Sequence, residues 1–575
     1  MTHVSAPRRL ALLALTLLAG CAAAGPDGTT AVTATPAPPS GAFGPYLAGR
    51  FASSETDTRT AADQLMAALR VEPNEAEILT RAFLATVMDG RMDATRLARR
   101  LPDNQVAVLL LIGADAQAGR WDRAEQRLRG MPRQGATGLL TPLWTAWVQQ
   151  GRGNTDQALA TLRPHIEQGR LRGTHALHAA MIADIAGRQR DAERFIRTAL
   201  AESPEANLRL LTIAAGILVR SGREAEATRL LEAAARGNDD LALAYTPAAR
   251  RQILTTRAVA TPVEGMAEAQ LALAAALRGQ GAGEIGLLLT RMALRLRPDF
   301  SAALLLTSDM LADERHPDTA LATLDQIPAG DPLAAVVALR RAILLDRLDR
   351  TAQAEAALLV LSTALPENPQ PSARLGDILR ARNRFPEAVV AYDVALSRIP
   401  NPGPADWPLF YARGIAQERS GRWQRAEADF QRALQLAPEQ PYVLNYLGYT
   451  WVEQGQNLLE ARRMLERAAE LRPQDGNIAD SLGWALFKIG DLPGAIRWME
   501  KAVELESRNS VVNDHLGDVY WTAGRRAEAQ FQWRRALNTD PEPGDVARIE
   551  VKLRDGLAGP SVPTAQAGGE PRPAP

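Results

Sequence analysis

The chain has 575 residues, of which 46% are hydrophobic and 23% are charged, and its 66 basic and 66 acidic side chains give a formal net charge of zero. This length exceeds one typical domain several times over, and the hydrophobic content excludes wholesale disorder. The lack of a basic excess argues against a broad nucleic-acid-binding surface. One cysteine and six histidines argue against an internal disulfide, an iron–sulfur cluster or a dense metal site, so we expect no cofactor.

The N-terminus has the pattern of a secretory signal. Two arginines precede an apolar stretch over 10–18, which is followed by small residues and then Cys21. This stretch is too short to span a bilayer. Residues 18–21 (LAGC) resemble the lipobox of bacterial lipoproteins. That resemblance implies that the signal peptide 1–20 is removed and that Cys21 receives a diacylglycerol thioether and an acylated amine. The alternative is an ordinary cleaved signal that happens to precede a cysteine.

The residue after this cysteine bears on localisation. Position 22 is Ala rather than Asp. By resemblance to sorted lipoproteins of diderm bacteria, an Ala at this position implies an outer-membrane protein that faces the periplasm. Its lipid would be its only contact with the membrane. Residues 21–41 are rich in Ala, Gly, Thr and Pro, which is typical of a flexible tether.

A 34-residue period organises the C-terminal part of the chain. Small residues recur at positions 8 and 20 of each period, and large apolar residues recur at positions 7, 11 and 24. The pattern resembles the tetratricopeptide repeat (TPR) family. That resemblance implies an all-α fold, a TPR α-solenoid in which helix-turn-helix repeats stack into a right-handed superhelix. The small residues that we expect where the two helices of a repeat cross are Gly414, Ala426, Gly448, Ala461, Gly483, Ala495, Gly517 and Ala529.

Fainter copies of the repeat run upstream. Their position-8 residues are Gly49, Ala82, Ile112, Ala146, Ala180, Ala215, Ala274, Ser308, Ala342 and Gly376. The long step from Ala215 to Ala274 predicts a hinge or an extra helix. The proline-rich stretch 400–404 predicts a loop. The predicted parts are an N-terminal TPR-like array over 42–238, an irregular helical segment over 239–265, a middle array over 266–400 and a C-terminal array over 401–543.

Two segments follow these arrays. Residues 544–556 predict an amphipathic helix that covers the last repeat, with Asp545 as its N-cap and Gly556 as its stop. Residues 557–575 are rich in Pro, Gly and Ala, which is typical of a disordered tail.

The sequence contains only weak matches to motifs of catalytic, nucleotide-binding or metal-binding sites. Gly281–Gly286 matches the dinucleotide-binding pattern GxGxxG, but a helical pattern precedes it where that motif needs a strand, so we interpret it as a turn between repeat helices. His175 and His178 could share a metal, but no third ligand lies nearby, and we interpret them as surface histidines. The sequence contains no GxSxG elbow, HExxH motif or P-loop. We therefore expect a protein without enzymatic activity and without a small-molecule substrate.

The inner face of the C-terminal repeats is the candidate binding surface. In TPR proteins, positions 2, 5, 9 and 12 of each first helix face the groove. Aromatic rings and carboxylates at such positions suit an extended peptide, and the alternative is that they only brace neighbouring helices. The Lys/Asn/Arg clamp with which some relatives hold a C-terminal carboxylate is absent. The groove residues carried over from the resemblance are Tyr411, Tyr442, Asn445, Tyr449, Asn477, Asp480, Trp484, Phe487, Asp514, Asp518 and Trp521.

A narrower resemblance concerns function. The stretches 445–449 (NYLGY), 480–484 (DSLGW) and 515–521 (HLGDVYW), together with the lipobox, look like those of one group of outer-membrane TPR lipoproteins. The resemblance implies a scaffold that brings a periplasmic C-terminal processing protease together with peptidoglycan hydrolases. The alternatives are a structural component of an envelope assembly or polysaccharide export machine and, third, an enzyme.

Overall fold

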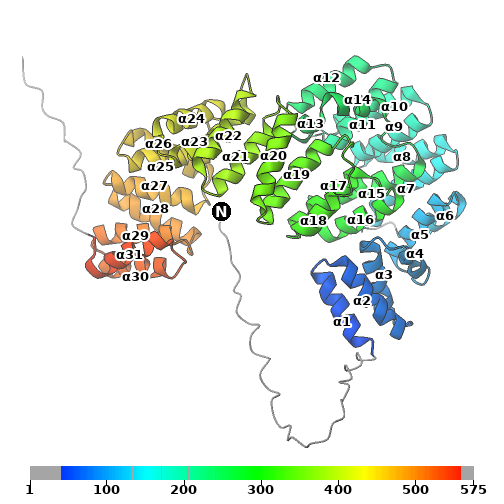
Figure 1. Ribbon diagram of the computed structural model, residues 1–575, viewed down its shortest axis with the longest axis horizontal. Coiled ribbons are helices and arrows are strands. Elements are labelled where there is room, and N and C mark those ends of the chain that lie inside the picture. Colours follow the sequence, from blue (N-terminus) through cyan, green and yellow to red (C-terminus); the bar gives the residue numbers. More distant parts are fainter. Residues whose placement is uncertain (1–40, 133–134, 170, 204–205, 237–238, 558–575) are drawn as a thin grey trace, which may run out of the picture. The chain divides into compact units, whose positions relative to one another are not determined.

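The computed structural model describes residues 41–132, 135–169, 171–203, 206–236 and 239–557. Every regular element in these ranges is a helix, so the predicted all-α solenoid is confirmed (Figure 1). The signal peptide, Cys21, most of the tether and nearly all of the tail lie outside the described residues. Their assignments therefore stay predictions, as do the predicted boundaries of the arrays.

The described chain forms two compact units, which divide after Asp89. The first unit contains α1 (Phe43–Ser54), α2 (Thr58–Val71) and α3 (Ala76–Met88). Helices α1 and α2 pack closely because Gly49 has no side chain. A Cβ at this position would lie 2.6 Å from the Cγ of Leu65.

The second unit continues the series of paired helices. Its first part contains α4 (Asp93–Ala98), α5 (Gln105–Gln117), α6 (Trp121–Arg129), α7 (Gly135–Gly151), α8 (Thr155–Gln168), α9 (Arg172–Ile185), α10 (Gln189–Ala201), α11 (Leu208–Arg220) and α12 (Glu224–Ala235). Two short helices, α13 (Asp239–Ala244) and α14 (Pro247–Thr255), then occupy the segment where the repeat spacing is long. They account for most of the extra residues.

The middle and C-terminal repeats follow. The middle repeats contain α15 (Pro262–Arg278), α16 (Gly283–Leu296), α17 (Ser301–Asp313), α18 (Pro317–Leu324), α19 (Ala334–Arg347), α20 (Thr351–Ala364), α21 (Gln370–Ala381) and α22 (Phe385–Ser397). After the predicted loop and a 3-10 turn at Pro404–Asp406, the C-terminal repeats contain α23 (Trp407–Arg419), α24 (Trp423–Leu436), α25 (Pro441–Glu453), α26 (Leu458–Leu471), α27 (Gly476–Lys488), α28 (Leu492–Leu505), α29 (Ser510–Thr522), α30 (Arg526–Leu537) and α31 (Pro543–Asp555).

The position-8 glycines show why the repeat has its spacing. A Cβ on Gly414 would lie 2.6 Å from a ring carbon of Phe430, and one on Gly483 would lie 2.8 Å from the Cγ of Met499. At Gly517 it would overlap the indole of Trp533. The large residue at position 24 of the second helix therefore packs directly on the glycine of the first. The position-20 alanines Ala426, Ala461, Ala495 and Ala529 are fully buried beside these contacts.

The turn between the two helices of a repeat requires a left-handed backbone at one residue. This residue follows position 8 by seven or eight residues, and glycine adopts the left-handed conformation there without steric cost. The C-terminal repeats place Gly421, Gly455, Gly490 and Gly524 there, with φ between +67° and +87°. Gly281 has φ +76° and lies between α15 and α16, so the GxGxxG stretch begins in the predicted turn, and from Gly283 onward it forms the first turn of α16.

The C-terminal helix confirms one predicted boundary and corrects the other. Gly556 follows α31 with φ +75° and ends it, as expected. The N-cap is Glu542 rather than Asp545, because Pro543 takes the first helical position, where its missing N–H costs nothing. Asp545 instead lies in the first turn, where its carboxylate interacts favourably with the helix dipole.

The repeats upstream of α17 do not contact only their neighbours. Helix α15 packs against α5, α7 and α9, which lie far from it in sequence. The Trp144 indole donates a hydrogen bond of 3.0 Å to the carbonyl of Met266, and Gly265 lies directly against the Trp147 ring. Gln117 donates a hydrogen bond of 3.0 Å to the carbonyl of Arg295. This part of the second unit therefore folds back on itself.

Candidate protein-binding surface

The inner face of the C-terminal repeats begins with an aromatic group on α23 and α25. Tyr411 lies 5.9 Å from Tyr446, edge to face, and 6.0 Å from Phe430. Burial raises the pKa of Tyr411 to about 12. Its ring therefore mainly braces neighbouring helices. Tyr442 is 41% exposed, and the guanidinium of Arg472 lies 5.6 Å from its ring centre.

The central part of this face is built from α25 and α27. The Trp484 ring stacks on His515 at 4.1 Å with an interplanar angle of 19°, and its Nε1 donates a hydrogen bond of 2.5 Å to Glu453. The ammonium of Lys488 lies 5.2 Å from the Trp484 ring centre. Phe487 lies 5.3 Å from the same ring. Trp484 and Phe487 are partly exposed, so they present apolar surface beside a carboxylate and an ammonium.

Tyr449 and Asn445 adjoin this group on α25. Burial, assisted by the negative charges of Glu453 and Asp480, raises the pKa of the Tyr449 hydroxyl. The phenol therefore stays neutral and can donate a hydrogen bond. The buried Oδ1 of Asn445 has no hydrogen-bond partner within the described part of the chain. This face therefore offers a phenol donor near its aromatic surface.

A buried ion pair supports the Trp484 ring from below. The Nδ1 of His515 lies 3.0 Å from Asp480. Burial alone would lower the pKa of His515, but the Asp480 carboxylate outweighs it and raises that pKa above its usual value of 6.5. Asn477 lies at the edge of this group, exposed, and its side-chain oxygen accepts a hydrogen bond of 3.2 Å from Asn509.

The last predicted groove residues are covered by α31. The ammonium of Lys552 lies 2.8 Å from Asp514 and 2.7 Å from Asp518, and all three side chains are buried. The Trp533 indole also donates a hydrogen bond of 2.9 Å to Asp518. Trp521 packs against Gly556 at the end of α31. These residues hold the last helix in place, which is the bracing role that the sequence left open.

The structure therefore divides the predicted groove into two groups. Asp514, Asp518 and Trp521 face α31, and Asp480 and Tyr411 face neighbouring repeats. Of the remaining residues, Tyr442, Asn445, Tyr449, Asn477, Trp484 and Phe487 are at least partly exposed, as are Tyr411 and Trp521 beside their packing contacts. Whether a ligand binds them stays a prediction.

The two histidines of α9 correct a sequence interpretation. His175 and His178 are 4% and 1% exposed, so they are not surface residues. The Trp147 indole donates a hydrogen bond of 2.9 Å to the Nδ1 of His178, and burial lowers the pKa of His178 to about 3. Within the described ranges, no three His, Cys, Asp or Glu side chains gather to hold a metal ion. No described helix is both long enough and apolar enough to cross a membrane.

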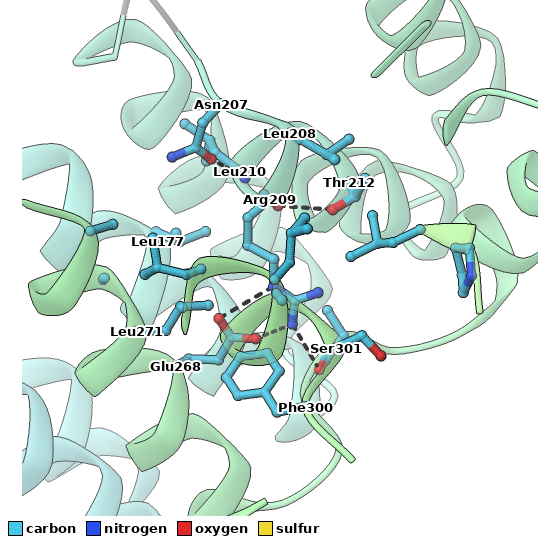
Figure 2. Close-up of a pocket in the computed structure, with 18 of the residues that line it drawn as sticks. Leu177, Asn207, Leu208, Arg209, Leu210, Thr212, Glu268, Leu271, Phe300 and Ser301 are labelled. Carbon is cyan, nitrogen blue, oxygen red and sulfur yellow. Dashed lines mark hydrogen bonds and ion pairs between the residues drawn. The ribbon is translucent and has the colours of Figure 1, made fainter. Parts of the chain in front are cut away.

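A cavity of about 560 Å³ was missed in the sequence. It lies among α9, α11, α14, α15 and α17, and Figure 2 shows Arg209 and Glu268 paired inside it. Arg209 and Glu268 both stand at position 2 of their repeats, counted from Ala215 and Ala274. Position 2 is one of the groove positions named above for the C-terminal repeats. The same positions in the fainter upstream repeats would therefore have indicated both residues.

Sequence comparison agrees with this architecture. Two tetratricopeptide repeat profiles match residues 407–440 and 453–509. The chain contains tetratricopeptide repeats. The matched regions include α23 and α27, two of the first helices that carry the inner face described above.

Two curated proteins and one solved structure illustrate what this chain is similar to. Two curated Pseudomonas aeruginosa proteins, each named as TPR repeat-containing, are 31% identical to this chain over 115 and 149 residues. These matches cover 20% and 26% of this chain, and they span 19% and 58% of the relatives' own lengths. A crystal structure titled as the APC/C hetero-tetramer Cut9–Hcn1 is similar over 90% of this chain and 96% of its own, at 15% identity and a TM-score of 0.37.

Proposed function

We propose that this protein is a non-enzymatic scaffold that holds other proteins on the inner face of its C-terminal repeats. The observation that carries the proposal is the open aromatic surface of Trp484 and Phe487, flanked by Glu453 and Lys488. Partly exposed rings supply large contact area at low entropic cost, and charged groups beside them orient a polypeptide. Helices α27 and α29 hold this surface rigid, because His515 and Asp480 lie paired beneath it.

We further propose that lipid on Cys21 tethers the scaffold to the outer membrane, facing the periplasm. The lipobox-like residues 18–21 and the Ala at position 22 support this. Several acyl chains hold a protein stably at a bilayer, whereas one chain binds weakly. Tethering two partners on one chain raises the local concentration of one near the other.

The proposed partners are a C-terminal processing protease and peptidoglycan hydrolases. This rests on the resemblance of the stretches 445–449, 480–484 and 515–521 to one group of TPR lipoproteins. A pulldown of the tagged full chain from detergent-solubilised envelope tests it. Recovery of a protease together with a wall hydrolase supports the proposal. Recovery of an outer-membrane barrel or a polysaccharide synthase instead would contradict it.

The tether has a test of its own. Cys21→Ser removes the only thiol in the sequence, so we expect the protein to move from the membrane pellet to the soluble periplasmic fraction. Separation of fractions and immunoblotting measure this. Ser53→Ala, far from the lipobox, is the control and should stay with the membrane. Retention of the Cys21→Ser protein in the pellet would contradict lipid tethering, but it would not bear on the scaffold proposal.

A further inference from the structure

The cavity among α9, α11, α14, α15 and α17 has the placement of a second binding groove. First helices of successive repeats supply most of its lining, and Figure 2 shows Leu177, Arg209 and Leu271 facing a common space from three of them. A volume of about 560 Å³ is within the usual range for ligand sites. Because the lining spans several repeats, the space suits an elongated ligand.

The walls of this groove are largely apolar. Leu177 from α9, Leu271 from α15 and Leu305 and Leu306 from α17 line it. All but Leu271 are partly exposed, so a ligand could bury them further. Burial of such side chains favours a ligand that carries apolar groups.

Each arginine in the groove already has an acidic neighbour. Arg209 pairs with Glu268 through two nitrogens and also donates to the carbonyl of Ala258 at 3.3 Å. Arg257 lies 3.5 Å from Asp184, which Arg220 also binds at 2.8 Å, and Arg297 lies 3.5 Å from Asp299. A ligand anion would therefore compete with these carboxylates for the arginines.

Two of the five carboxylates that line the groove are less well matched. Glu268 and Asp299 lie beside the arginines named above, and Asp240 pairs with Arg340 at 3.0 Å, which leaves Asp309 and Asp331. Asp309 lies 3.4 and 3.5 Å from its two arginine partners, and burial raises its pKa. Asp331 accepts hydrogen bonds from the Ser301 hydroxyl at 2.5 Å and the Leu333 amide at 2.8 Å, which are both neutral donors. A cation beside either of these two carboxylates would gain more than an anion would.

One neutral donor completes the site. His178 lines the groove, and its Nδ1 accepts from Trp147, so its Nε2 carries the ring proton. This Nε2 is buried, and none of the described residues accepts a hydrogen bond from it. A buried donor without a partner costs free energy, which a ligand carbonyl would recover.

We propose that this groove binds an extended peptide segment of a partner protein in which basic side chains alternate with apolar ones. One basic side chain meets Asp331 and another meets Asp309, the apolar ones lie on the leucines, and a backbone carbonyl accepts from His178. The site is separate from the Trp484 surface. It deepens the scaffold proposal, because a chain with two grooves can hold two partners.

Fluorescence anisotropy on the full chain tests this with a labelled, end-capped heptapeptide of alternating leucine and lysine. The comparison peptide has glutamate in place of lysine. We expect the lysine peptide to bind at least tenfold more tightly, and its affinity to fall as salt is raised. Absence of lysine-peptide binding, or equal binding of the two peptides, would overturn the proposal.

Isosteric variants locate the binding. Asp309→Asn and Asp331→Asn should each weaken lysine-peptide binding about five- to tenfold while leaving the thermal melt in place. Asp318→Asn, an exposed carboxylate on the neighbouring α18, is the matched control and should change nothing. If Asp309→Asn and Asp331→Asn bind as the unaltered chain does, the proposal fails. Trp484→Ala should not change the binding of this peptide. Failure of the proposal for the C-terminal surface is therefore distinguishable from failure of the proposal for the groove.

Discussion

The C-terminal repeats and the repeats around α15 bury their apolar side chains in different ways. From α23 to α30, each pair closes on a glycine beneath a large residue, as at Gly414 with Phe430. Around α15, long-range contacts add to the core, because Trp144 and Trp147 reach helix α15 from α7. A regular repeat therefore leaves its inner face open. In the folded-back segment, part of the inner face packs against other helices of the same segment, and the rest forms a bounded groove.

The strongest test of this contrast is to remove the long-range anchor. Trp147→Ala deletes a fully buried indole that contacts Gly265 and His178, so we expect a loss of about 3–5 kcal/mol in unfolding free energy. Hydrogen exchange should rise in α7 and α15 together. If exchange rises in α7 but not in α15, the two segments are not coupled as described.

The second test concerns the regular repeats. Gly483→Leu places a side chain where Met499 already lies, and we expect a loss of about 3 kcal/mol, confined largely to α27, α28 and their neighbours. Local hydrogen exchange measures this. Gly544→Ala is the control, because a Cβ there meets nothing within 4 Å. An unchanged exchange profile for Gly483→Leu would show that the repeat register is wrong.

A smaller effect depends on pH. The pKa of His515 is raised in the folded chain by Asp480, so the stability from its protonation is fully present below the usual pKa of 6.5. It is lost as pH rises through the higher folded pKa. The unfolding free energy of the unaltered chain should therefore exceed that of His515→Gln by more at pH 5.5 than at pH 8.5. A difference that grows with pH would contradict the assigned ion pair.

The sequence predicted the regular part of the fold better than the rest. Small residues at positions 8 and 20 carry a local signal, and Gly483 and Ala495 lie where this signal requires. The contact of Trp144 with Met266 joins residues 122 positions apart, and no periodicity marks it. His178 is buried and bonded to Trp147 of the preceding repeat, a contact that its local sequence did not indicate.

The candidate site was predicted in part for a similar reason. The repeat register placed Trp484 and Phe487 on a partly exposed inner face. It could not show that Lys552, from outside the repeats, would bind Asp514 and Asp518. That pairing depends on where α31 turns back, which the helix boundaries alone do not determine.

The most direct test of the scaffold account compares two tryptophans of one repeat. Trp484 lies on the inner face of α27, whereas Trp498 lies on the second helix α28, and both are partly exposed. Quantitative pulldown from solubilised envelope should show that Trp484→Ala loses most of its captured protease and hydrolase while Trp498→Ala keeps them, with both variants folded by circular dichroism. Equal capture by the two variants would contradict the claim that this inner face holds the partner.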